Sequence, residues 1–504
     1  MDVLQNLMNG FAVALTPQNL MFAFIGSFLG TAIGVLPGIG PAAGCALLIP
    51  LTGHLDPTGS IIMLTALFYG TQYGGTITSV LLNVPGEAAS AVTCIDGYQM
   101  AKKGRGGVAL SISAIGSFIG GTFASVSLIL IAGPLTRMAL EFGPVEFFAL
   151  MVLGLSLLMG LAGKSMVKTF MMGIVGLLLA MIGMDPVRGS PRFTFGRMEL
   201  MDGIGFVPVI MGLFGLAEIL ENAEAEFKQV FQNMLSSLVP TRQDIKDSAM
   251  PIVRGSLLGT VLGLIPGMTN TASSFLSYVM EKKLSKYPEK FGTGVIEGVA
   301  GPETANNAHA NGALIPLFTL GIPASPTIAV IMGAFMMNGL IPGPFLFKDQ
   351  PALVWGVIAS FFVGNVILLI LNLPLIGIWI KVLKMPYSIL FGLILAFMVV
   401  GVYSIDNTTF DVMIMGLFGL FGYLLRKLDF PMAPVVLTLI LGPLMERSLR
   451  KSMEISQGDF SILWSSPISA GLLIVAAVFL ISSAFSFQLF GRKAKSSRAE
   501  DEEV

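Results

Sequence analysis

The chain has 504 residues, of which 54% are hydrophobic and 12% are charged, and its formal net charge at pH 7 is −1. Soluble domains carry about 25% charged residues, so this composition excludes an ordinary soluble domain and indicates a polytopic protein of the lipid bilayer. The chain shows no basic stripe, so nucleic acid is not expected as a partner. Its two cysteines are too few for a disulfide framework.

Uncharged segments long enough to form membrane helices occur along the whole chain. A spanning helix needs about 20 residues, and the uncharged segments that exceed this length are 3–55, 57–86, 106–136, 255–280, 351–380 and 460–491. With the shorter apolar runs, they predict an all-α polytopic membrane protein with about 12 membrane segments.

One stretch occurs twice in the chain, as GSFLGTAIGVLPG at 26–38 and as GSLLGTVLGLIPG at 255–267. Each copy has a glycine at every fourth position, which allows a second helix backbone to approach closely in a membrane. Each copy then ends in a Pro-Gly pair, which interrupts a helix. A glycine stripe alone indicates only helix packing, but two copies with the same break predict a duplicated architecture with broken helices.

A second irregular stretch follows each Pro-Gly break. The stretches 69–90 and 302–327 align with each other in a way that pairs Gly74 with Gly312 and Pro85 with Pro323. Each predicts a helix that is interrupted at a proline within the membrane and then resumes, as in a re-entrant hairpin or a discontinuous helix.

The distribution of basic residues predicts that the two copies are inverted. Lysines occur in 281–291 but not in the corresponding 52–62, and basic residues occur in 228–254 but not in 1–17. The loop 102–105 is basic, whereas 338–344 in the second half is not. Because cytoplasmic loops are enriched in Lys and Arg, the N-terminus is expected outside and the basic C-terminal tail in the cytoplasm, while the side of the mixed-charge loop 185–202 stays open.

These features predict five successive regions. They are a first repeat at 1–225, a cytoplasmic connector at 226–250, a second, inverted repeat at 251–460, a final transmembrane helix at 461–491 and a cytoplasmic tail at 492–504.

Small polar residues and glycines surround the four breaks, and we expect them to form the binding site. A broken helix exposes N–H groups that favour anions and carbonyls that can hold a cation. The alternative is that these side chains only satisfy the freed backbone groups. The residues expected to bind substrate or cation are Pro37, Gly38, Gly40, Gln72, Thr76, Asn83, Gly86, Ser90, Pro266, Gly267, Thr269, Asn270, Thr271, Glu303, Asn306, Asn307, Asn311, Gly321, Pro323 and Ser325, with Thr327 nearby.

Acidic residues near the breaks have two possible interpretations. Glu87 and Glu303 are either functional carboxylates within the membrane or residues at its interface, and Asp96 and Glu297 are expected to be solvated loop residues. No Lys or Arg occurs within the four breaks, so an anion there would be held by helix ends and amides, assisted by bound cations. No acid–base or metal cluster suggests an enzyme, and no cofactor is expected beyond such a cation.

At these residues the chain resembles the large membrane subunit of the tripartite tricarboxylate transporters. The resemblance is carried by LPGIGPAAG at 36–44, by 69–90 and by DGYQMAKKGRGGVALS at 96–111. In the second half it is carried by LIPGMTNTASS at 264–274, by GPETANNAHANGALIPLFTLGIPAS at 301–325 and by the turn at 342–344.

The resemblance implies a carrier of the bacterial inner membrane, with its N-terminus in the periplasm. It implies two partners, a small membrane subunit of four helices and a periplasmic binding protein that delivers a carboxylate such as citrate. Import would be driven by a cation gradient, with Na⁺ held by backbone carbonyls near Gly38, Asn83, Gly267 and Gly321, and the fold would comprise a scaffold and a moving transport domain. The alternatives are a carrier that needs no binding protein, a passive channel and a membrane enzyme.

Overall fold

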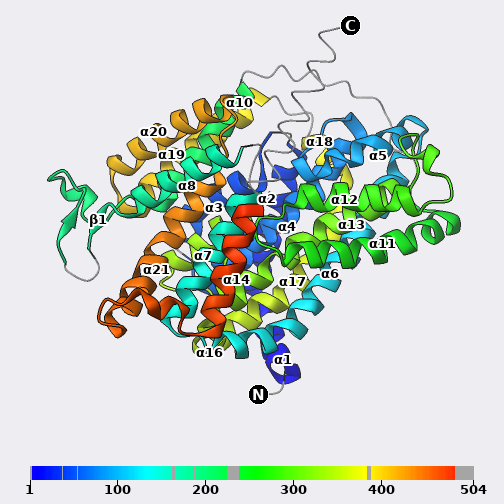
Figure 1. The fold of residues 1–504 in the computed structure, drawn as a ribbon. Coiled ribbons are helices and arrows are strands. Elements are labelled where there is room, and N and C mark those ends of the chain that lie inside the picture. The colour runs from blue at the N-terminus through cyan, green and yellow to red at the C-terminus, as the bar shows by residue number, and fades with distance from the viewer. Residues whose placement is uncertain are drawn as a thin grey trace, which may run out of the picture. The chain divides into compact units, whose positions relative to one another are not determined.

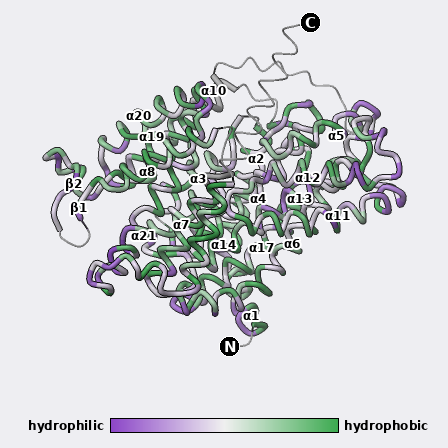
Figure 2. Tube along the Cα trace, viewed as in Figure 1, coloured by the Kyte–Doolittle hydropathy of each residue, from purple (hydrophilic) through white to green (hydrophobic). Residues whose placement is uncertain are grey.

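The computed structural model describes residues 3–36, 38–53, 55–161, 165–185, 189–223, 238–382 and 387–482. The described chain is almost entirely helical, which confirms the predicted all-α class, and Figure 2 shows hydrophobic residues along most of it. Contacts divide it into two compact units, one formed by Met1–Leu140 with Val207–Tyr423 and the other by Glu141–Phe206 with Leu424–Val504.

Four of the described helices are long and apolar enough to cross a membrane, namely α2 (Pro17–Val35), α6 (Gly106–Ala139), α17 (Pro351–Asn372) and α20 (Thr409–Lys427). Shorter apolar helices accompany them, including Pro467–Ser482, the described part of the expected final helix. The remainder of that helix from 483 and the tail 492–504 lie outside the described residues, as does 226–237 of the connector. The expected total of about 12 segments stays a prediction.

The first unit contains most of the helices (Figure 1). Besides α2, α6, α17 and most of α20, its elements are α1 (Val3–Ala14), α3 (Pro41–Thr52), α4 (Pro57–Leu82), η1 (Ala88–Ala91), α5 (Thr93–Lys102), α9 (Phe206–Ile210), the π-helix η3 (Met211–Leu216), α10 (Ala217–Ala223), α11 (Arg242–Gly263), α12 (Asn270–Leu284), η4 (Pro288–Lys290), α13 (Glu297–Gly312), α14 (Leu314–Leu320), α15 (Pro326–Met337), α16 (Pro344–Asp349), α18 (Ile376–Val382) and α19 (Tyr387–Asp406).

The second unit packs α21 (Ala433–Ile455) against α7 (Pro144–Leu161) and α8 (Met166–Ala180). Its remaining elements are β1 (Gly183–Met184), β2 (Pro191–Arg192), η2 (Met198–Leu200) and η5 (Phe460–Trp464). The strands pair antiparallel. The loop 185–202 is tied to α21 by ion pairs, because Arg192 contacts Glu446 (2.7 Å) and Arg450 contacts Asp185 (2.9 Å).

The glycine stripes hold two pairs of helices together in the same way. A methyl group added at Gly26, Gly30 or Gly34 of α2 would collide with the carbonyl oxygens of Met63, Leu67 and Thr71 of α4. The equivalent glycines of α11 face α13, where the colliding carbonyls belong to Gly301, Ala305 and His309. The predicted close approach of backbones is therefore confirmed, and Figure 1 shows α11, α12 and α13 side by side.

The predicted breaks have matching backbone conformations in the two halves. Gly38 (φ 91°) and Gly267 (φ 90°) both adopt positive φ, which glycine tolerates best. Asn83 (φ 59°) ends α4 and Gly321 (φ 72°) ends α14, both in the left-handed conformation. The sequence alignment that pairs Gly74 with Gly312 also pairs Asn83 with Gly321.

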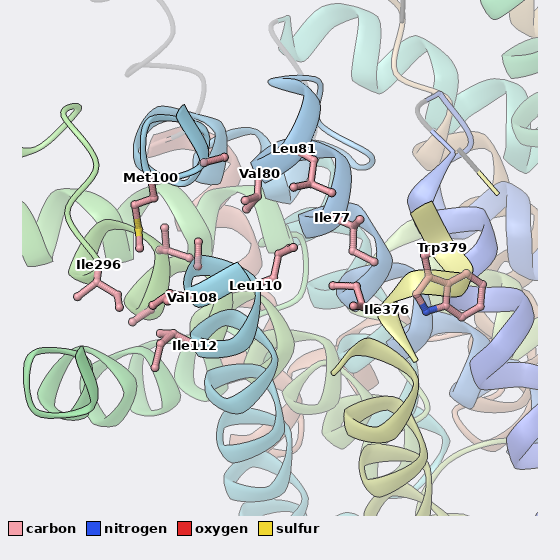
Figure 3. Packing of buried hydrophobic residues seen from close by; sticks show 14 of the residues in the cluster. Ile77, Val80, Leu81, Met100, Val108, Leu110, Ile112, Ile296, Ile376 and Trp379 are labelled. Atoms are coloured by element: carbon pink, nitrogen blue, oxygen red, sulfur yellow. The ribbon is translucent and has the colours of Figure 1, made fainter. Parts of the chain in front are cut away.

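A cluster of buried apolar residues joins α4, α5, α6, α13 and α18 in the first unit. Figure 3 shows Ile77, Val108 and Trp379 among these residues, and Trp379 Nε1 donates to the Leu371 carbonyl at 2.8 Å. The cluster thus packs Ile77, Val80 and Leu81 of α4 among apolar residues of the other helices.

The predicted cytoplasmic loop 102–105 contacts the connector and the chain just after the predicted cytoplasmic segment 281–291. Lys103 Nζ donates to the Thr293 carbonyl (2.6 Å), and Arg105 pairs with Asp244 at the start of α11. Burial raises the pKa of Asp244, but hydrogen bonds from Thr241 and Arg105 outweigh it and leave this pKa below its ordinary value. Figure 2 shows hydrophilic residues gathered at these ends of α11 and α12.

The expectation for Asp96 is wrong. Asp96 lies on α5 and is fully buried. Its carboxylate is satisfied there by hydrogen bonds from the Gly292, Gly294 and Val295 amides (2.7–3.0 Å) and from the Tyr278 hydroxyl (2.8 Å). Glu297 is half-buried as the first residue of α13, so it is not a loop residue either.

We expect Gly259→Ala to destabilise the protein by about 1–3 kcal/mol, because the added methyl group would overlap the Ala305 backbone. The measurement is the thermal unfolding midpoint in detergent. Gly364→Ala in α17 is the matched control, since its methyl group would meet nothing within 4 Å. Equal midpoints for the two variants would contradict the packing role of the stripe.

Candidate functional site

A cavity of about 310 Å³ lies in the first unit, where the helix breaks meet. Its walls come from segments far apart in the sequence. They are Gly38–Pro41, Pro85–Ala89, Thr269–Thr271 and Ser325–Thr327, together with Gln72 and Glu218.

Helix N-termini form most of this wall. Gly40 is the N-cap of α3, Thr269 of α12, Ser325 of α15 and Glu87 of the short helix η1. Thr269 Oγ1 accepts from the Ala272 amide (3.1 Å), and Ser325 Oγ accepts from the Ile328 amide (3.3 Å). Because the N-terminal end of a helix carries partial positive charge and unpaired N–H groups, this convergence favours an anion.

The N-caps occupy equivalent places in the two halves. Gly40 pairs with Thr269 when the alignment of 26–38 with 255–267 is extended just beyond the Pro-Gly break. Glu87 pairs with Ser325 in the alignment of the second irregular stretches. The cavity is thus built from two pairs of matching helix starts.

The charge on the wall is acidic. Among the described residues that line the cavity there is no Lys, Arg or His, whereas Glu87 and Glu218 are both present. Glu218 Oε1 accepts from the Gly40 amide at 2.5 Å, so a carboxylate already occupies the N-terminal end of α3.

An amide network supports the cavity from behind. Asn306 Nδ2 donates to Glu87 Oε1 (2.8 Å), and Asn270 Nδ2 donates to Asn306 Oδ1 (3.1 Å). The Gln72 amide completes the network when its nitrogen is assigned to the side that faces the acceptors, with Nε2 then 2.8 Å from both Glu87 Oε1 and Asn306 Oδ1. The carboxylate of Glu87, only 7% exposed, is therefore held by two amides rather than by a basic residue.

A second carboxylate lies deeper. Glu303 of α13 is 1% exposed, and its Oε2 accepts from the Thr76 hydroxyl (2.6 Å) while its Oε1 accepts from the Thr93 hydroxyl. Both Glu87 and Glu303 are thus interior carboxylates of this unit.

Most of the expected site residues fall into three groups. Those that line the cavity are Gly38, Gly40, Gln72, Gly86, Thr269, Asn270, Thr271, Ser325 and Thr327. Thr76, Ser90, Glu303 and Asn306 lie behind the wall in hydrogen bonds, while Asn83, Gly267 and Gly321 form the helix breaks with Pro266 and Pro323 beside them. Pro37 lies outside the described residues.

Asn307 and Asn311 are placed differently. Asn307 Nδ2 donates to Ser117 Oγ (2.7 Å) and Asn311 Nδ2 donates to the Gly121 carbonyl (2.8 Å), so both connect α13 to α6 and neither lines the cavity.

Glu218 is the acidic wall residue that sequence reasoning missed. Its only signal is an acidic residue directly after the apolar run that ends at 217.

This fold and cavity define a class, the helical membrane proteins in which broken helices meet at a polar interior site. The chain belongs to the tripartite tricarboxylate transporter TctA family, whose model matches residues 20–437. No solved structure matches it.

Two relatives from Agrobacterium vitis are similar to the chain. One, described as an uncharacterized 52.8 kDa protein in the TAR-I ttuC' 3' region, is 49% identical over 476 residues, which cover 94% of this chain and 95% of the relative. The other, an uncharacterized protein in the TAR-II ttuC' 3' region, is 51% identical over 223 residues, which cover 44% of this chain and 92% of the relative.

Asn306→Ala removes the amide that donates to Glu87 and accepts from Asn270. Losing a hydrogen bond to a buried charged group costs about 1.5–3 kcal/mol, so we expect uptake of the substrate to fall roughly tenfold or more while membrane assembly is retained. The measurement is uptake normalised to the amount of protein in the membrane. Wild-type uptake by a well-expressed variant would remove Asn306 from the site.

Proposed function

We propose that the chain is the large transmembrane subunit of a binding-protein-dependent secondary transporter that imports carboxylates, citrate or a related di- or tricarboxylate, by Na⁺ symport. The observation that supports this most directly is the convergence of matching helix N-termini on a cavity whose described lining has no basic side chain. The Glu218 carboxylate on the Gly40 amide is an example of the chemical group that such a helix end accepts.

The strength of these contacts argues for co-transported cations. Each helix terminus stabilises an anion by about 0.3–1 kcal/mol, and by about 2 kcal/mol when partly buried. Desolvating a multiply charged anion costs far more than this. Because Glu87 and Glu218 would add negative charge to the wall when ionised, we infer that cations enter with the substrate. The carbonyls near Gly38, Asn83, Gly267 and Gly321 are proposed ligands.

The proposed architecture is two inverted repeats in the bacterial inner membrane, with the N-terminus in the periplasm and the C-terminus in the cytoplasm. Two groups of contacts support this topology. The basic segment 102–105 contacts the basic segment 228–254 through Arg105 and Asp244, and its Lys103 contacts Thr293, two residues after the basic segment 281–291. By contrast, Gln18 at the start of α2 contacts Asp56 (3.1 Å) in a segment that lacks basic residues. The first unit, which holds the cavity, is the proposed transport domain of a scaffold-and-carrier mechanism.

Two partner proteins complete the proposal: a small membrane subunit of four helices and a periplasmic protein that captures the carboxylate. The tripartite organisation in the family's name supports both. The binding protein would then share the selection of substrate with the cavity.

The test is uptake into vesicles that hold the full chain and the small subunit, with the binding protein added outside. We expect saturable carboxylate uptake that requires both Na⁺ and the binding protein. Full uptake without the binding protein would indicate a self-sufficient carrier. Flux without Na⁺ dependence or saturation would indicate a passive channel and overturn the proposal.

The membrane potential gives a second test. If the substrate enters with three negative charges, two Na⁺ leave one net negative charge, whose import against about 150 mV, inside negative, costs about 3.5 kcal/mol. We therefore expect at least as many cations as substrate charges. Collapsing the potential with a K⁺ ionophore should not accelerate uptake, and a faster initial rate would contradict this stoichiometry.

A further inference from the structure

A second, much smaller void of about 10 Å³ lies in the first unit between α4, α6 and the α17–α18 region. This volume is close to that of one water-sized sphere. Ile77, Leu110 and Ile376 form its apolar walls, and Figure 3 shows them converging from three helices. A space of this size is suited to a single small ion or one water molecule.

The polar groups around the void are arranged as acceptors. The Thr76 hydroxyl donates its hydrogen to Glu303 Oε2 (2.6 Å), and the Tyr73 hydroxyl donates to Asn365 Oδ1 (3.4 Å). Asn372 Nδ2 donates to the Leu368 carbonyl (2.9 Å), while Asn372 Oδ1 has no hydrogen-bond partner although the residue is only 4% exposed. Since these hydrogens are used elsewhere, the oxygens have lone pairs left to offer.

The ionisable group beside the void is a carboxyl that lacks a basic partner. None of the ion pairs formed by the described residues includes Glu303, and its other neighbours are the hydroxyls of Thr93 and Ser113. The Ser113 residue also lines the void. A buried carboxylate without a counter-charge is strongly unfavourable, so a cation beside it would be stabilised.

We propose that this void is a monovalent-cation site of Na⁺ size, with Asn372 Oδ1 and the hydroxyl oxygens of Thr76 and Ser113 as ligands and Glu303 as the balancing charge. Oxygen ligands of this kind suit a hard cation. The inference rests on the proposed function, in which charge balance requires more than one cation, and it adds a position separate from the helix breaks.

The void is connected to the cavity by two helices. Thr76 and the cavity residue Gln72 are one turn apart on α4, and Glu303 and Asn306 are less than one turn apart on α13. Residues at this spacing share a helix face. A cation that orders Thr76 and Glu303 would therefore also order the amides that hold Glu87 at the cavity wall.

The experiment measures Na⁺ binding to the purified full chain in detergent. NaCl is titrated against choline chloride at constant ionic strength, and the thermal unfolding midpoint is recorded, with KCl as a second salt. We expect a saturable rise with Na⁺ that K⁺ reproduces only weakly. Asn372→Leu and Glu303→Gln should each raise the half-saturating Na⁺ concentration at least tenfold.

Asn338→Leu is the matched control, because Asn338 Nδ2 also donates to the carbonyl four residues earlier (2.8 Å) but the residue lies away from the void. Its Na⁺ titration should equal that of the wild type. If Asn372→Leu does not fold, Ser113→Ala tests the same ligand set with a smaller change.

Three results would overturn the inference. One is a wild-type midpoint that does not respond specifically to Na⁺, as for a void that holds water. Another is a midpoint that follows pH but not Na⁺, as for a protonated Glu303. The third is an Asn372→Leu or Glu303→Gln variant, each folded, that titrates like the wild type. If the wild type takes up carboxylate in a Na⁺-dependent way but the Asn372→Leu variant titrates like the wild type, only this site is rejected. If Asn372→Leu weakens Na⁺ binding but the wild type transports no carboxylate, only the proposed function is rejected.

Discussion

Close contact between glycine-bearing helices and neighbouring backbones is the constraint on which the rest of this structure depends. In a bilayer, an interrupted helix is tolerated only where protein surrounds the freed backbone groups. The stripes of α2 and α11 bring two other backbones near enough to do this. The Gly267 amide donates to the Ala324 carbonyl (2.9 Å) at the second break of the same half. The Gly86 amide donates to the Gly75 carbonyl of α4 (3.3 Å), so these freed backbone groups find partners within the protein. Bulkier side chains in the stripes would separate the helix ends that form the cavity.

Much of this organisation could be predicted from the sequence, because it depends on local patterns. A glycine at every fourth position specifies a helix face, and a Pro-Gly pair specifies a break at Gly38 and Gly267 with positive φ. Most of the cavity lining therefore consists of the glycines and small polar residues that the sequence places at the breaks.

The remaining features depend on contacts between distant segments. The sequence suggests a solvated Asp96 because its partners Gly292, Gly294 and Tyr278 belong to the other half of the chain. Glu218 reaches Gly40 from an equally remote segment. Asn306 and Asn307 are adjacent in sequence, yet a helix directs neighbouring side chains about 100° apart, so one faces Glu87 and the other faces Ser117. Residue type alone could not separate these two roles.

The cavity combines features that oppose each other electrostatically. Helix N-termini attract an anion, while Glu87, Glu218 and the more buried Glu303 would repel it when ionised. A site that bound carboxylates without cations would gain from basic residues in the wall, and the described wall has none. A site that binds an anion only together with cations gains instead from acidic residues in the wall. When ionised, these interior carboxylates make the empty cavity unfavourable for the anion and favourable for the cation. In the proposed symport, these charges favour cations binding first and the substrate second.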